Sequence, residues 1–130
     1  MPAPRLLTLG KEERISSKRI VDRLFSGGKG RSMVGFPIRL VYVKYSRESD
    51  REPDASVLIS VPKRCFKSAV KRNRVKRQIR EAYRHHKDLF HVPAGKCVAM
   101  AFIWTDNQLH SSEQVKRSVV GLLKRMNEKL

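Results

Sequence analysis

One segment, residues 63–87, constrains the fold and the surface of this chain more than any other. It holds 11 lysines and arginines against a single acid, Glu81, which gives it a local net charge of +10. At about 100° per residue, its apolar and small side chains fall on one helical stripe, which predicts a helix packed on a core. The stripe consists of Ser68, Val75, Ile79, Ala82 and His86. We therefore expect a helix that begins near Lys67 or Ser68 and ends by Lys87.

The rest of this helix is predicted to be basic on more than one side. Like charges three and four residues apart repel one another, so a solvated surface helix usually mixes signs. Arginine offers phosphate a planar fork of donors, whereas lysine offers it a point charge. One flank of the helix carries Asn73, Lys76, Arg80 and Lys87, and Arg72 and Tyr83 lie at its border with the apolar stripe. Arg77 and Arg84 extend this flank around the side of the helix that faces away from the core. Arg74 lies beyond them, on the side opposite to the first flank. This distribution favours a nucleic-acid-binding surface over a solubilising helix.

Composition limits the class of protein. The chain has 130 residues, of which 40% are hydrophobic, and a net charge of +17. These values predict one folded domain over residues 1–130, with residues 1–15 as an irregular N-terminal arm. No apolar run approaches the roughly 20 residues of a membrane span, and the N-terminus lacks the apolar core of a secretory signal. Cys65 and Cys97 have no paired spacing, which is typical of reduced thiols, so we expect a cytoplasmic protein without a membrane partner.

The hydrophobic patterns predict an α+β fold in the order α-β-β-α-β-α, a single-domain sandwich of a sheet packed by helices. The first helix is expected between a cap at Ser16 or Ser17 and a stop at Gly27-Gly28, followed by a flexible bridge at 29–31. Strands are expected over 36–43, 57–61 and 97–104, with the basic helix between the second and the third. A capping box of Ser111 and Gln114 is expected to open the last helix. Residues 46–54 are polar and are predicted to form the tip of a hairpin between the first two strands. The nearly continuous apolar strand at 97–104 is expected to lie centrally, covered on both faces.

Alternation in the first strand predicts which side chains it buries. Phe36, Ile38 and Leu40 are expected to face the core. Pro37, Arg39 and Val41 are then expected on the opposite side of the sheet.

The sequence holds no pattern that indicates protein-borne catalysis. His110 directly precedes Ser111 and Ser112, which is not how a catalytic triad is built. The acids within 46–54 are expected to be solvated turn residues, and the four histidines lack metal-ligand spacing. We therefore expect no catalytic residue and no metal held by the protein.

Three linked segments resemble the protein subunit of bacterial ribonuclease P. They are Val61-Pro62-Lys63-Arg64, Ala69-Val70-Lys71-Arg72-Asn73-Arg74-Val75-Lys76-Arg77 and Arg80-Glu81-Ala82-Tyr83-Arg84. An Arg-Asn-Arg helix after a Val-Ser-Lys-Lys-type strand end marks that family, and the resemblance extends across nearly the whole chain. Two departures stand out: Pro62 replaces the serine, and the approach to the helix at 65–70 is one residue longer than the Ile-Gly-Asn-Ala-Val segment of the family.

The resemblance implies a function. In that family an RNA subunit is the catalyst of an endoribonuclease that removes the 5′ leader from precursor tRNA with bound Mg²⁺, held mainly by the RNA. The small protein binds the leader and raises the affinity for substrate and metal. The implied partners are the catalytic RNA subunit and precursor tRNA, not DNA. The resemblance also implies a left-handed β-α-β crossover, an exception to the usual right-handed rule.

The resemblance further divides the basic residues between two RNA partners. It implies a shallow cleft between the sheet, the first helix and the basic helix, which takes the single-stranded leader. The residues implied on the leader side are Arg72, Asn73, Lys76, Arg80, Phe25 and Arg39. Those implied on the catalytic RNA side are Arg74, Arg77, Lys63, Arg64 and Arg84. For Phe25 plain core packing is an equal alternative, and its helical partner position, Val21, is not aromatic.

Two other classes of function are compatible with a basic chain. A structural ribosomal or assembly protein that holds folded rRNA would show the same steep salt dependence. The Arg-Asn-Arg pattern, and processing of precursor tRNA with catalytic RNA added, separate it from the ribonuclease P subunit. Attachment to an anionic membrane is disfavoured, because no amphipathic helix places Trp or Phe opposite its lysines.

Overall fold

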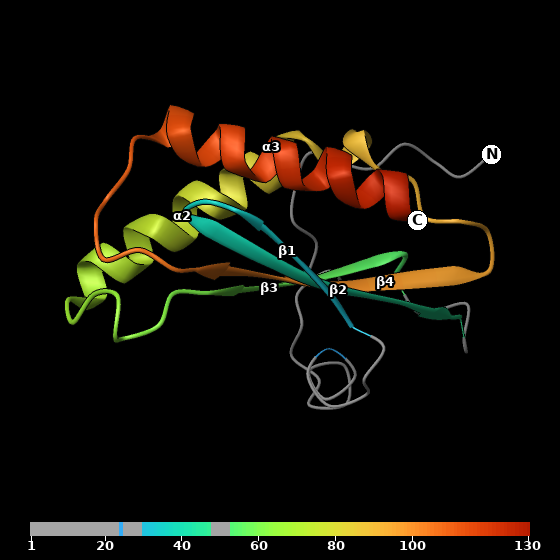
Figure 1. Cartoon of the computed structure of the whole chain (residues 1–130), viewed down its shortest axis with the longest axis horizontal. Helices are drawn as coiled ribbons and strands as arrows, with labels where there is room; N and C mark the ends of the chain where they lie inside the picture. Colours follow the sequence, from blue (N-terminus) through green and yellow to red (C-terminus); the bar gives the residue numbers. More distant parts are fainter. Residues whose placement is uncertain (1–23, 25–29, 48–52) are drawn as a thin grey trace.

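The computed structural model describes residues 24, 30–47 and 53–130. The elements within them are β1 (Arg31–Gly35), β2 (Ile38–Ser46), β3 (Ala55–Ser60), α2 (Ala69–His85), a short 3₁₀ helix η2 (Lys87–Leu89), β4 (Lys96–Trp104) and α3 (Ser112–Lys129). Both long helices lie on the same face of the four-stranded sheet (Figure 1). The predicted N-terminal arm and most of the first predicted helix, including Phe25, lie outside the described residues.

The sheet has the strand order β1-β2-β4-β3. β1 pairs with β2, and β2 with β4, in antiparallel fashion, whereas β3 runs parallel to β4. Parallel neighbours need a crossover connection, and here α2 carries the chain from β3 to β4. The mixed α+β class predicted from the sequence is therefore confirmed, and the left hand of the crossover stays an implication of the resemblance.

β4 is the central strand, as its apolar run predicts. It lies between β2 and β3, and residues 97–102 are buried without interruption. On the side that faces the helices, the core of the sheet consists of Ile38, Leu40, Tyr42, Ala55, Val57, Val98, Met100, Phe102 and Trp104. On the other side, a smaller apolar cluster contains Leu24, Val41, Val43, Ala99 and Ala101. Both faces of β4 are thus covered.

The beginning of the sheet differs from the prediction. The chain forms a hairpin in which β1 precedes β2, so Arg31 opens a strand and does not belong to a flexible bridge. Phe36 and Pro37 form the turn between the two strands; Phe36 is 61% exposed, and Pro37 is buried. The prediction that Phe36 faces the core and Pro37 the opposite side was wrong, because the chain reverses direction there and the alternation of β2 starts at Ile38.

The predicted hairpin tip at 46–54 was also wrong. β2 and β3 are not neighbours, since β4 lies between them. The segment after β2 is therefore a connection between separated strands. Arg47 and Asp54, on either side of it, form an ion pair, and the Arg47 N–H donates to the carbonyl of Gly95 at 2.9 Å.

The last helix begins where its capping pattern predicts. Ser111 is the N-cap of α3, and its hydroxyl accepts a hydrogen bond from the Gln114 N–H at 3.1 Å. Gly35 allows β1 to approach this helix closely, because a Cβ added there would lie 3.0 Å from Cγ of Leu122. The close packing of the hairpin on α3 thus depends on a residue without a side chain.

Candidate nucleic-acid interface

The basic helix α2 has a defined start. Ser68 is its N-cap, and the Ser68 hydroxyl accepts a hydrogen bond from the Lys71 N–H at 3.3 Å. A turn after β3, closed by the Cys65 N–H and the Pro62 carbonyl at 3.0 Å, leads into it. α2 itself begins at Ala69, so the prediction of a start near Lys67 or Ser68 is confirmed.

The core stripe of α2 is confirmed in its middle, whereas at its two ends Ser68 is an exposed N-cap and His86 is a half-buried C-cap. Val75 and Ile79 are completely buried, and Ala82 lies beside them with only 7% exposed. Tyr83, expected at the border of the stripe, is completely buried, with its ring centroid 6.0 Å from that of Phe102. α2 is therefore fixed to the sheet along one line, which leaves two flanks on either side of that line.

The first flank of α2 comprises Arg72, Asn73, Lys76 and Arg80. Asn73 is exposed, and the other three are half-buried. Nη1 of Arg72 donates to the carbonyls of Phe66 and Lys67, both at 2.9 Å, so this side chain also ties the preceding loop to the helix. Nε of Arg80 is buried and finds no acceptor among the residues that the structure describes. A buried donor without an acceptor costs free energy.

Lys87 does not belong to the exposed part of this flank. It lies beyond the end of α2, in η2, and is only 2% exposed. Its Nζ lies 5.9 Å from the ring centroid of Tyr83, a cation–π distance. The prediction that placed it with Lys76 and Arg80 was wrong, because the α-helix ends at His85 and the 3₁₀ turn carries Lys87 back towards the core.

The second flank of α2 comprises Arg74, Arg77 and Arg84 and turns towards α3. Arg74 and Arg77 are exposed. Nη2 of Arg84 donates to Oε2 of Glu81 at 2.6 Å, and this hydrogen bond is the main cause that lowers the pKa of Glu81 below its usual value. Arg84 is thus engaged within the helix, whereas Arg74 and Arg77 present their charge to solvent.

A groove of about 480 Å³ separates this second flank from α3. Arg77 and Glu81 line it from α2, and Ser112 and Lys116 line it from α3. Gln78 joins the two helices, because its Nε2 donates to the Ser112 hydroxyl at 3.2 Å and to the His110 carbonyl at 3.1 Å. Lys116 was not predicted as a site residue, although helical spacing from the Ser111 cap would have placed it on the outer surface of the last helix.

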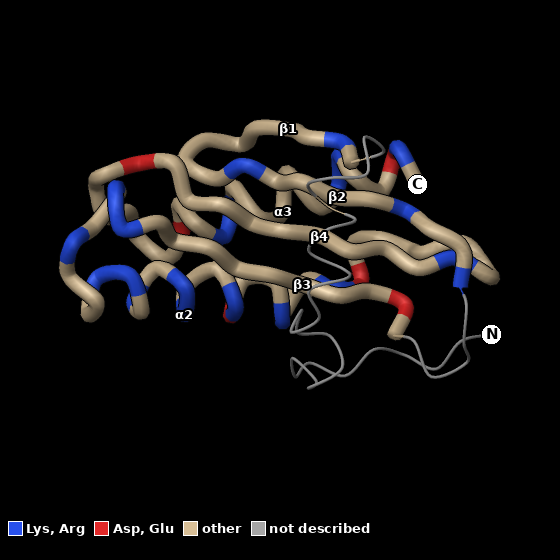
Figure 2. Tube along the Cα trace, turned by 90° about the horizontal axis from the view of Figure 1, so that it is seen from below, with Lys and Arg blue, Asp and Glu red and all other residues tan. Residues whose placement is uncertain are grey.

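The two flanks face different surroundings. By helical spacing, Lys76 and Arg80 lie on the side of α2 opposite to Gln78, and therefore away from α3. Figure 2 shows α2 beyond the β3 edge of the sheet, with basic residues along its length. Lys63 and Arg64 are exposed in the turn between β3 and α2. The exposed cations of this turn and of the second flank are called the basic rim below; they are Lys63, Arg64, Arg74 and Arg77.

Arg39 is the predicted site residue that lies farthest from the helix. It is exposed on β2, where its Nε donates to the Ser32 hydroxyl of β1 at 2.8 Å. Its cross-strand partner Ile103 places it on the sheet face opposite to the helices. Two strands, β4 and β3, lie between Arg39 and the edge beside α2, roughly 10 Å at the usual strand spacing. A ligand that contacts both Arg39 and the first flank must span at least this distance.

Neither a metal centre nor a membrane span is found in the part of the chain that the structure describes. Residues 24, 30–47 and 53–130 contain no group of three or more His, Cys, Asp or Glu side chains that could hold a metal ion. Over the same residues, no helix is both long and apolar enough to cross a bilayer. One polar pair there is Asp106 with His110, whose Oδ2 and Nε2 lie 2.6 Å apart.

A mixed sheet with one strongly basic helix along its edge defines a class of small basic α+β proteins with a surface complementary to polyanions. The sequence model of the ribonuclease P family matches residues 9–127, so the chain belongs to this family. Its recognition from the Arg-Asn-Arg helix is therefore confirmed.

Individual relatives agree with this membership. The chain is 43% identical over 89 residues to a ribonuclease P protein component of Porphyromonas gingivalis, which covers 68% of this chain and 62% of that protein. It is 37% identical over 101 residues to the ribonuclease P protein component of Desulfotalea psychrophila, and the matched region covers 78% of this chain and 75% of that protein. The chain thus matches less than two thirds of the length of the Porphyromonas protein. The solved structure of the ribonuclease P protein from Thermotoga maritima superposes with a TM-score of 0.66 at 21% identity, over 87% of this chain and 96% of that one, which is a likeness of fold.

Proposed function

We propose that this chain is the RNA-binding protein subunit of a ribonuclease P ribonucleoprotein, which assists a catalytic RNA in the endonucleolytic removal of the 5′ leader from precursor tRNA. The observation that carries the proposal is α2, a helix fixed to the core by Val75 and Ile79 and basic on both remaining flanks. Family membership over residues 9–127 supports the same function. The chemistry belongs to the RNA, and the protein contributes binding.

On the leader side, the proposed contacts are Arg72, Asn73, Lys76, Arg80, Phe25 and Arg39. A single strand is usually held by cations that follow its phosphates and by aromatic rings that stack on its bases. Lys76 and Arg80 are one helical turn apart, so they can contact neighbouring phosphates. Arg39 lies two strands away from the edge beside α2, so a ligand that contacts all three cations must also extend along the sheet.

On the catalytic RNA side, the proposed contacts are Arg74, Arg77, Lys63, Arg64 and Arg84. These residues lie on the second flank of α2 and in the turn before it, and all except Arg84 are exposed. Arginine forks match phosphate oxygens, and exposed cations accelerate association through long-range attraction. A folded RNA can contact the basic rim and the groove beside Lys116 without covering the first flank.

In the proposed complex the RNA, and not the protein, binds most of the Mg²⁺. The protein's cations neutralise phosphate charge near the substrate, which reduces the amount of Mg²⁺ that the complex needs in solution. The proposed compartment is the cytoplasm, and it agrees with Cys65 and Cys97, which are not joined in a disulfide.

Reconstitution tests the proposal. Precursor tRNA is incubated at low Mg²⁺ with a bacterial catalytic RNA, with this protein, or with both. We expect leader cleavage by the mixture, little by the RNA alone and none by nuclease-treated protein alone. Robust cleavage by the RNA-free protein, or a mixture no more active than the RNA, would contradict the proposal.

A further inference from the structure

Phe36 is a large aromatic side chain held at the surface by a rigid turn. It is 61% exposed at the tip of the β1–β2 hairpin. Its carbonyl accepts a hydrogen bond from the Ser118 hydroxyl of α3 at 2.9 Å. The N–H and the hydroxyl of Thr105 both donate to the carbonyl of the following Pro37 at 3.0 Å. The backbone is thus anchored to α3 and to the end of β4 while the ring faces solvent.

The ring of Phe36 packs against the ring of His110. Its centroid lies 5.8 Å from that of the His110 ring, in an edge-to-face arrangement with an interplanar angle of 79°. The His110 ring is held by Asp106 and packs at 5.4 Å on the completely buried ring of Trp104. Since most of Phe36 remains accessible, it can receive another planar group without moving its support.

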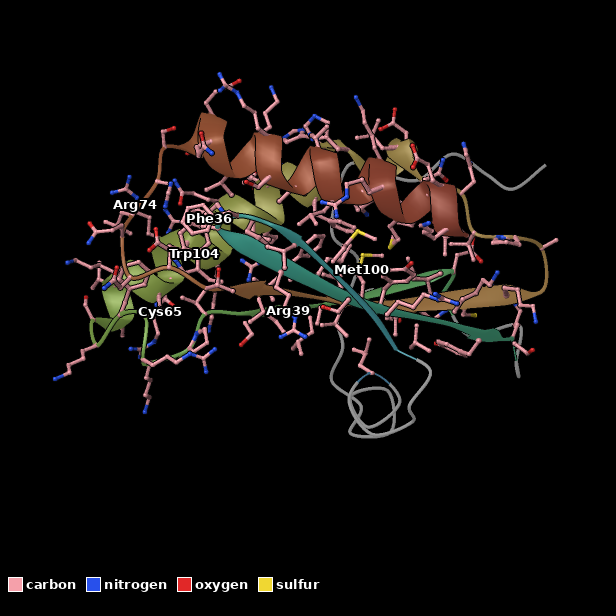
Figure 3. The ribbon with its side chains drawn as sticks, viewed as in Figure 1. Phe36, Arg39, Cys65, Arg74, Met100 and Trp104 are labelled. Carbon is pink, nitrogen blue, oxygen red and sulfur yellow. The ribbon has the colours of Figure 1, made fainter. Side chains whose placement is uncertain are left out.

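This aromatic site adjoins the second flank of α2. The His110 carbonyl accepts a hydrogen bond from Gln78 of α2. Arg74 lies one helical turn before Gln78 and therefore on the same face of the helix. Figure 3 shows Arg74, Phe36 and Trp104 at the same end of the molecule. The groove next to Gln78 adds the cations Arg77 and Lys116.

We infer that Phe36 stacks on an unpaired base of the catalytic RNA, with the His110 ring as its support. The inference rests on the proposed function, which places the catalytic RNA on the second flank. RNA is recognised mainly at splayed-out bases that stack on aromatic rings, while nearby cations hold the backbone. A second copy of this chain is a poor occupant, because the exposed cations around the ring would repel each other.

The test measures the affinity of the protein for catalytic RNA without substrate. Phe36→Ala is expected to weaken binding by roughly tenfold, and Phe36→Trp to stay within about threefold of the wild type, because stacking is lost in the first and kept in the second. Val34→Ala is the matched control, since Val34 is 59% exposed on the same hairpin but aliphatic. We expect it to bind as the wild type does, and all three variants to unfold at the wild-type temperature.

Phe36→Trp adds a spectroscopic readout. Trp104 is completely buried, so the new indole should dominate any fluorescence change at the surface. Quenching when catalytic RNA is added would support stacking, and unchanged emission at saturating RNA would overturn it. Wild-type affinity of Phe36→Ala, or full affinity of Phe36→Leu, would also overturn the inference. Failure of the wild-type protein to bind catalytic RNA would instead remove the proposed function, and this inference with it.

Discussion

The two long helices pack on the same face of the sheet but differ in what they present to solvent. α3 buries six of its 18 residues and carries five basic and two acidic side chains. α2 buries only four of 17 and carries seven basic side chains and one acid, Glu81. α3 thus contributes more side chains to the core, and α2 carries the larger excess of positive charge.

The excess positive charge of α2 is expected to lower the stability of the free protein. In α3 the acids are close to basic residues, as in the weak contact between Glu113 and Arg117 at 3.8 Å. In α2 the one acid, Glu81, is in contact with Arg84 and His85 and lies one turn after Arg77, so a single carboxylate is shared among seven Lys and Arg side chains. The free helix must therefore withstand repulsion that packing at Val75 and Ile79 offsets. Binding of RNA is expected to relieve this repulsion and to raise the unfolding temperature.

The largest expected effect is a loss of stability when a core side chain of α3 is truncated. Leu122 is completely buried, and it also packs close to Gly35 of β1. Leu122→Ala is expected to lower the free energy of unfolding by about 2–5 kcal/mol, through lost burial and the cavity left behind. Denaturant unfolding measures this change. Arg77→Ala in α2 is the comparison and should change the free energy of unfolding by no more than about 0.5 kcal/mol. Equal losses would mean that the two helices do not divide core and surface as described.

The second prediction addresses the second flank of α2. The double variant Arg74→Glu, Arg77→Glu places negative charge against phosphate, which lowers the affinity for RNA more than truncation of both side chains to alanine does. We expect at least about a tenfold loss of affinity for catalytic RNA, partly overcome at high protein concentration, with normal thermal unfolding. A binding titration without substrate measures it.

A charge-matched variant controls for net charge alone. Lys124→Glu with Lys129→Glu changes the charge of α3 by the same amount at exposed positions. Its affinity for catalytic RNA should fall much less. If both double variants lose the same affinity, the contact is a general attraction and not a defined second-flank interface.

The third prediction addresses the first flank. Lys76→Ala with Arg80→Ala removes two phosphate partners, each worth on the order of 1 kcal/mol. Affinity should fall for precursor tRNA with a leader and change little for mature tRNA. The slope of log affinity against log salt should decrease by roughly one to two units. Equal losses for both tRNAs would indicate that this flank holds the tRNA body or the catalytic RNA.

The smallest expected effect concerns the support of Phe36. The hydrogen bond from His110 lowers the pKa of Asp106 below its usual value. A depressed pKa stabilises the fold above the ordinary aspartate range and loses this contribution as the pH falls through the folded-state pKa. The unfolding temperature of the wild type should therefore fall more steeply below about pH 4 than that of Asp106→Asn. Parallel curves for the two proteins would show that the pair contributes nothing to stability.

The sequence predicted the elements that have a strong local pattern. The stripe of Val75, Ile79 and Ala82, the caps at Ser68 and Ser111, and the apolar central strand all follow from spacing and side-chain chemistry. These features depend on neighbours within a few turns of the chain, so they are visible without tertiary structure.

Other features depend on contacts between distant segments and could not be predicted in this way. The strand order places β4 between β2 and β3, which no local pattern encodes. The turn at Phe36 interrupts what reads as one alternating strand, so its exposure was missed. Lys87 was expected in solvent, but the 3₁₀ turn brings it to the Tyr83 ring. Likewise, the hydrogen bonds of Arg72 to the loop before α2 require the folded loop.

Directed cleavage from the two flanks of α2 tests the central claim most directly. A hydroxyl-radical probe is attached to cysteine in Lys76→Cys or Arg74→Cys, two positions on opposite sides of α2 by helical spacing. Each change is combined with Cys65→Ser; Cys97 is completely buried and should not react. The probes are compared in the complex of protein, catalytic RNA and precursor tRNA. We expect cuts in the leader from position 76, and cuts confined to the catalytic RNA from position 74. Leader cleavage from position 74, with cuts only in the catalytic RNA from position 76, would contradict the assignment of the two flanks.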